Sequence, residues 1–184
     1  MAMKRFPCEM FASIELNQVE FPWQGMVVSQ CPLSEDFTKE APCENGMWVD
    51  ADKSNLEIRP ISDETSVVGV VYTTEKEYDM FHYGLKTFGR KVAGDYPRVG
   101  IFSKGDTITS NCFCYDDGEF ADEEALFAAC ADFANAPLYV VPVAGSAVPQ
   151  LTASKPDEGC YAKVCKDYTM PNGEHGLKYM IQRV

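Results

Sequence analysis

The stretch GDTITSNCFCYDDGEF, residues 105–120, gathers side chains that could bind a metal or act as nucleophiles. Cys112 and Cys114 flank one phenylalanine, and acidic residues follow directly. Residues 107–115 alternate as a strand, in which Cα atoms two apart lie about 6.5 Å apart and their Cβ vectors run parallel. A disulfide prefers about 5.5 Å and converging vectors, so we expect no local bridge.

We expect the two thiols to pack as small apolar side chains on the strand face that carries Ile108. The residues expected on the opposite face are Thr109, Asn111, Phe113 and Tyr115. A structural zinc site is not expected, because zinc knuckles use Cys-x-x-Cys pairs and the chain contains none.

A catalytic cysteine would need a histidine base, and the chain has two histidines, His82 and His175. Neither is flanked by a recognisable catalytic signature. No phosphate-binding glycine loop, serine nucleophile elbow or His-Glu-x-x-His sequence is present either. We therefore predict no catalytic residues and no cofactor. A small hydrolase that uses one cysteine with His82 or His175 remains the alternative of a different class.

Two acidic segments could suggest calcium. DADKSNLEIRPI, which begins at Asp50, has Asp, Asp and Ser at the first, third and fifth positions of an EF-hand loop. Its sixth position is Asn55 instead of Gly, and its twelfth is Ile61 instead of a bidentate Glu. YDDGEF at 115–120 fails the same comparison. We expect both segments to be turns between strands and predict no metal site.

Composition and charge limit the classes of function. With 184 residues and 46% hydrophobic side chains, the chain can bury the core of one domain. Its formal net charge of −12 argues against binding to nucleic acid or to anionic membranes. No apolar run approaches the roughly 20 residues of a membrane span, and the first residues do not resemble a secretory signal. The eight cysteines are therefore expected to be reduced in a cytoplasm.

The pattern of the chain predicts a mainly β fold, a compact sandwich or barrel-like domain with one short helix. ADEEALFAACADFA predicts the helix at about 122–134, with Asp122 as N-cap. Prolines in two strand-like segments, 137–145 and 147–154, favour edge strands. The other expected strands lie in 45–62 as a strand-turn-strand, in 66–74, in 98–106, and in a closing hairpin formed by 160–170 and 177–184.

Residues 1–45 differ from the rest, residues 46–184, which we expect to form the β-rich domain. Four prolines punctuate the segment, so an extended N-terminal arm or edge segment is expected. ASIELNQ predicts a short strand with Ile14 and Leu16 on one face, and GMVVSQ predicts another. Aromatic side chains often anchor interfaces. The residues that we predict to contact a partner are Phe6, Phe11, Phe21 and Trp23.

Three stretches together resemble small virion proteins encoded in the structural gene clusters of tailed bacteriophages. They are VVGVVYTTEKEYD, YPRVGIFSKGDTITSNCFCYDD and KDYTMPNGEHGLKYMI. The proteins they resemble are the capsid decoration, or cement, and minor head proteins. The resemblance covers roughly Gly46 to Val184 and is weaker over the first 45 residues. None of its motifs is catalytic, so it implies a role and transfers no site residues.

The resemblance implies a non-enzymatic virion structural protein that binds the capsid exterior and stabilises the shell. Its partner would be the major capsid protein, and it would form a homo-oligomer on the capsid lattice after assembly in the host cytoplasm. The net charge of −12 agrees with the outside of a shell better than with its DNA-filled inside. A tail or neck structural protein of a phage is the alternative within the same class.

Overall fold

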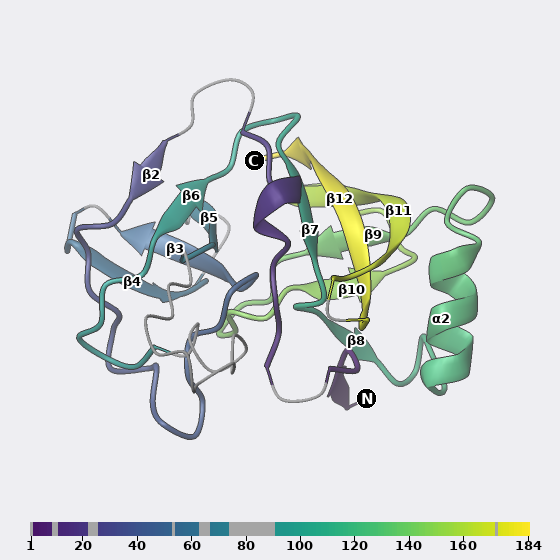
Figure 1. Cartoon of the computed structure of the whole chain (residues 1–184), viewed down its shortest axis with the longest axis horizontal. Coiled ribbons are helices and arrows are strands. Elements are labelled where there is room, and N and C mark those ends of the chain that lie inside the picture. The colour runs from purple at the N-terminus through teal and green to yellow at the C-terminus, as the bar shows by residue number, and fades with distance from the viewer. Residues whose placement is uncertain are drawn as a thin grey trace.

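The structure is a computed structural model that describes residues 2–8, 11–21, 26–52, 54–62, 67–73, 91–171 and 173–184. This part of the chain forms two β-sheets and one α-helix (Figure 1), which confirms the mainly β prediction. The elements in chain order are β1 (Met3–Arg5), the 3-10 turn η1 (Leu16–Gln18), β2 (Val27–Val28), β3 (Trp48–Asp52), β4 (Glu57–Pro60), β5 (Val68–Val71), β6 (Val99–Ile101), β7 (Thr107–Ser110), β8 (Cys114–Asp116), α2 (Glu123–Ala131), β9 (Tyr139–Val141), β10 (Gln150–Thr152), β11 (Tyr161–Thr169) and β12 (His175–Arg183).

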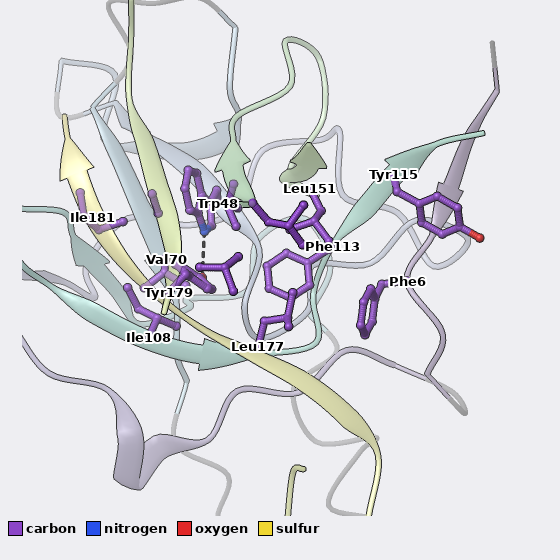
Figure 2. Packing of buried hydrophobic residues seen from close by; sticks show 14 of the residues in the cluster. Phe6, Trp48, Val70, Ile108, Phe113, Tyr115, Leu151, Leu177, Tyr179 and Ile181 are labelled. Atoms are coloured by element: carbon purple, nitrogen blue, oxygen red, sulfur yellow. Dashed lines mark hydrogen bonds between the residues drawn. The ribbon is translucent and has the colours of Figure 1, made fainter. Parts of the chain in front are cut away.

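The two sheets share one apolar core. The seven-stranded sheet has the order β1-β8-β10-β9-β11-β12-β7, and the five-stranded sheet has the order β2-β6-β5-β3-β4. Trp48 and Val70 from the smaller sheet pack with Ile108, Leu177 and Tyr179 from the larger one (Figure 2). Removal of these side chains from water is the main force that holds the sheets together.

The five-stranded sheet is buried on its other face as well. Alternate residues of its strands, such as Val49 in β3 and Val99 in β6, enter a second core. Side chains from the first 45 residues cover this face, among them Leu33 and Phe37. Burial on both faces explains why the sequence of β5 is continuously apolar, and all four of its residues are buried.

Both predicted hairpins are confirmed. β3 pairs with β4 in antiparallel register, and the Asp52 carboxylate accepts hydrogen bonds from the backbone N–H groups of Ser54 and Asn55 in the turn, at 2.9 and 3.1 Å. β11 and β12, with nine residues each, form the closing hairpin. In both hairpins, two alternating strands are joined directly by polar turn residues, which is the pattern that predicted them.

The predicted helix is confirmed, with a shorter C-terminal end. The Asp122 carboxylate accepts a hydrogen bond from Ala125 N–H at 2.8 Å, as expected of an N-cap. α2 ends at Ala131, three residues before the expected end. The reason is local, because the Asp132 side chain accepts a hydrogen bond from the Asn135 side-chain amide at 2.7 Å within the following turn.

The single strand expected over 107–115 is wrong, because the structure divides it into β7 and β8. Phe113 N–H donates to Asn111 C=O at 3.1 Å, a three-residue turn that interrupts the alternation. Ile108 and Phe113 therefore enter the shared core, whereas Cys112 enters the second core. The expectation that Ile108 and Cys112 occupy one face is wrong for the same reason.

The edge positions expected for the two proline-containing strands are also wrong. β9 and β10 lie in the interior of the seven-stranded sheet, between β8 and β11. Pro142 follows the last residue of β9, and Pro149 precedes the first residue of β10. The prolines thus bound these strands without interrupting their hydrogen bonds, which is compatible with an interior position.

The described residues of the N-terminal segment lie within the fold. β1 pairs with β8, and bridges join Ile14 to Ser110 and Glu20 to Thr107, so the segment covers the free edge of β7. Leu33 bridges Ile58 and covers the edge of β4 in the same way. The strand expected in ASIELNQ is wrong after Ile14, because the chain turns into η1 and leaves Leu16 37% exposed.

Candidate functional site

Phe6, the first predicted partner-contact residue, belongs to the shared core. Its side chain is 1% exposed. Its ring makes edge-on contacts with Phe113, Phe127 and His175, with centroid distances of 5.6, 5.8 and 5.6 Å. Phe6 thus connects α2, β12 and the residue that precedes β8, and it offers no surface to a partner while the domain is folded. Figure 2 shows the Phe6 ring beside that of Phe113.

The other three predicted contact residues lie in different settings. Phe21 is partly buried against the shared core and lies 5.6 Å from the Tyr72 ring. It covers Gly100, where a Cβ atom would come within 2.4 Å of the Phe21 ring. Phe11 is partly exposed, and Trp23 lies outside the described residues. Phe6 and Phe21 pack inward, so the structure does not bring these aromatic side chains together as one surface.

The N-terminal segment nevertheless supplies an edge strand to each sheet. β1 is the outer strand of the seven-stranded sheet, and its three residues are all exposed, including Met3 at 46%. β2 is the outer strand of the five-stranded sheet, and its Val27 is 43% exposed. An exposed edge strand is a template for pairing with another chain. The sequence did not single out Met3 or Val27, because the exposure of a strand residue depends on which strands pair beside it in the folded sheet.

A pocket of about 610 Å³ lies beside β1, between the N-terminal segment and two loops. Arg5 pairs with Glu44 at 2.8 Å, and Glu44 also accepts a hydrogen bond from Ala12 N–H at 2.9 Å. Phe37 and Met47 supply apolar walls. Because Glu44 compensates the charge of Arg5 and holds the backbone at Ala12, we assign this pair a structural role in fastening the N-terminal segment.

The thiols of this chain are mostly buried and protonated. All eight cysteines are unpaired, and six of them are buried. Burial raises the pKa of Cys112, Cys130 and Cys160 to about 12 and that of Cys114 to about 11. Because the thiolate is the reactive form, these four groups are poor nucleophiles at neutral pH.

We expect thiol labelling of the native protein to follow burial. Cys165 is exposed and Cys8 is half-buried, so iodoacetamide should modify Cys165 first and Cys8 more slowly. The other six should react only after unfolding in denaturant. Intact-mass measurement over time, followed by peptide mapping, checks this order. A stable disulfide under non-reducing conditions, or rapid modification of Cys114 in the native state, would contradict it.

His175 does not contact a thiol within the described part of the chain. Its imidazole stacks on Phe127 at a centroid distance of 4.5 Å and pairs with the Asp167 carboxylate across the β11–β12 hairpin. Cys114 and Cys165 donate instead to the backbone carbonyls of Pro149 and Lys163, at 3.5 and 3.4 Å. The second histidine of the Cys-His alternative, His82, lies outside the described residues.

The acidic segments have structural partners. The Asp50 carboxylate is almost fully buried, and it accepts hydrogen bonds from Arg59 Nε at 3.1 Å and from Val67 N–H at 3.0 Å. In YDDGEF, Asp116 accepts a hydrogen bond from Gly118 N–H at 2.8 Å. Among the described residues, no group of three or more Cys, His, Asp or Glu side chains could hold a metal ion.

Comparison of the chain with protein-family models, with curated proteins and with solved structures gives no match. Within the residues that the structure describes, no helix is long and apolar enough to cross a membrane.

Proposed function

We propose that this chain is a non-enzymatic structural protein of a tailed-bacteriophage virion, which binds the exterior of the capsid and stabilises the shell. The three stretches that resemble such proteins contribute β5, β6, β7, β8, β11 and β12. The resemblance therefore lies on the framework of both sheets. The net charge of −12 supports an outer position, away from packaged DNA.

The observation that carries the binding role is the exposed edge strand β1. Its backbone can extend the seven-stranded sheet with a strand of the major capsid protein, and Met3, which is 46% exposed, supplies apolar contact area. The exposed Lys4 in the same strand favours an acidic partner segment. Repetition of one such contact over a closed lattice multiplies a modest affinity, and homo-oligomerisation would add to it.

We expect Met3→Asp to reduce co-sedimentation with capsid particles at least about tenfold, because burial of a methionine side chain contributes about 1.5–3 kcal/mol. The exposed side chain can be changed without opening the core. Leu56→Asp is the matched control, since Leu56 is 57% exposed in the β3–β4 turn, away from β1. It should bind as the unmodified protein does.

Four outcomes would contradict the proposal or part of it. Undiminished co-sedimentation of Met3→Asp would remove β1 as the contact. Failure of the unmodified protein to bind capsids would reject the capsid role, and binding to isolated tails in a parallel assay would select the tail or neck alternative. Hydrolytic turnover that is lost on alkylation of a single thiol would favour the Cys-His enzyme instead.

A further inference from the structure

Arg183, at the end of β12, is held in a fixed orientation. Its Nε donates a hydrogen bond to Gly159 C=O at 2.6 Å, and its Nη1 donates to Asp157 C=O at 2.8 Å. Its guanidinium carbon lies 5.0 Å from the centroid of the Tyr161 ring. Two backbone carbonyls and one aromatic ring therefore position the guanidinium group before any ligand binds.

The positive charge of Arg183 has no carboxylate partner among the described residues. Its bonds go to neutral backbone carbonyls, whereas Arg5 and Arg59 form ion pairs with Glu44 and Asp50. The Nη2 atom is buried and has no hydrogen-bond partner. Because Nη2 is out of reach of solvent, a ligand could meet the guanidinium only on its Nη1 side, where the hydrogen bond to Asp157 is exposed.

A hollow of about 760 Å³ lies beside this guanidinium group. Its lining side chains carry two positive charges, Lys104 and Arg183, and no negative one; they are Phe102, Ser103, Lys104, Tyr161, Gln182, Arg183 and Val184. The hollow is wide and open to solvent. Two neighbouring cationic side chains stand out in a chain whose net charge is −12.

The turn between β6 and β7 holds Lys104 beside the end of β12. Gly105 N–H donates to Ile181 C=O at 2.9 Å, and Ile181 N–H donates to Asp106 C=O at 2.8 Å. The Asp106 carboxylate accepts a hydrogen bond from Ser103 N–H at 2.7 Å and is 1% exposed, so it does not line the hollow. Figure 1 shows this turn close to the C-terminal end of the chain.

We propose that this hollow, the Lys104–Arg183 pocket, binds a ligand through an oxyanion group, either a carboxylate or a phosphate. The exposed Nη1 side of the guanidinium would donate a hydrogen bond to one oxygen of the anion, and the flexible Lys104 ammonium would add a second positive charge. Phe102 and Tyr161 give apolar surface to the body that carries the anion. The pocket does not include β1, so the proposal is independent of capsid binding.

Titration with inorganic phosphate and with acetate, each against chloride at constant ionic strength, tests the proposal. We expect saturable chemical-shift changes at the backbone amides of residues 103–105, 159–161 and 182–183 with at least one of the two anions. The responding anion distinguishes a phosphate from a carboxylate ligand. Arg183→Gln should weaken the apparent affinity at least tenfold, and Lys104→Gln should weaken it several-fold.

Two further variants make the result decisive. Arg98→Gln is the matched control, because the Arg98 guanidinium also lies over an aromatic ring, Tyr72, at 5.9 Å but outside the pocket; it should bind the anion as before. Arg183→Lys retains the positive charge but loses the fixed guanidinium group. Its anion affinity should lie between those of Arg98→Gln and Arg183→Gln. No saturable response to either anion, or equal losses in Arg98→Gln and Arg183→Gln, would overturn the proposal.

Discussion

Replacement of Trp48 by alanine should cost about 3–5 kcal/mol of unfolding free energy, as expected for truncation of a buried tryptophan. Trp48 is 0% exposed at the centre of the core that joins the two sheets. Its ring lies 4.8 Å from the Phe102 ring and 5.9 Å from the Tyr179 ring, measured between centroids. Because the total free energy of unfolding of a folded domain is about 5–15 kcal/mol, the variant would retain little stability.

Urea unfolding followed by circular dichroism measures this loss. Tyr179→Phe is the informative companion, because the Trp48 Nε1–H donates a hydrogen bond to the Tyr179 hydroxyl at 3.1 Å. Without that acceptor, the buried Trp48 N–H is left unsatisfied, which should lower the unfolding free energy by about 1–3 kcal/mol. Tyr96→Ala, at a side chain that is 59% exposed, should change stability by less than about 0.5 kcal/mol. Equal effects at Trp48 and Tyr96 would contradict this assignment of the core.

A chain without residues 1–24 should fail to fold cooperatively. The deletion removes β1 from β8, removes Phe6 and Ile14 from the shared core, and uncovers the edge of β7. Loss of Phe6 alone should cost about 3–5 kcal/mol, by the mechanism of large-to-small core substitution. The uncovered strand would add a tendency to aggregate. A thermal melt by circular dichroism, with light scattering, measures both effects.

Single substitutions locate the cause of that failure. Phe6→Ala should lower the melting temperature strongly, whereas Met3→Ala, at the exposed first residue of β1, should leave it nearly unchanged. A truncated chain with the melting temperature of the whole protein would show that the segment is dispensable to the fold. We expect the truncated chain to unfold, so its loss of capsid binding would not show that residues 1–24 contact the capsid. The Met3→Asp variant, which should stay folded, tests that contact.

Features that depend on neighbouring residues could be predicted from the sequence. The β3–β4 and β11–β12 hairpins join alternating strands through short polar turns, and α2 begins at the carboxylate of Asp122. In each case, the hydrogen bonds that define the element connect residues close together in the chain. The buried strand β5 could be predicted in the same way, because a continuous apolar run is typical of a strand that is buried on both faces.

Features that depend on distant partners could not be predicted. The alternation of 107–115 continues through Phe113 in the sequence. In the structure, Ile108 packs in the shared core and Cys112 packs in the second core, on opposite sides of the five-stranded sheet. Likewise, the inward position of Phe6 depends on α2 and β12, and no residue close to Phe6 in the sequence signals it. The Lys104–Arg183 pocket combines a turn with the end of the last strand, which are adjacent only after folding.

The pairing of the N-terminal segment with β7 and β8 also sets the order in which the chain can fold during synthesis. Ser13 bonds to Asn111 across 98 residues, and Ala2 bonds to Asp117 across 115. The first residues to leave the ribosome must therefore wait for the partners that bury Phe6 and Ile14, roughly 5–20 s at translation rates of about 5–20 residues per second. Such long-range closure makes docking of this segment a late and slow step, during which its apolar side chains are open to chaperones.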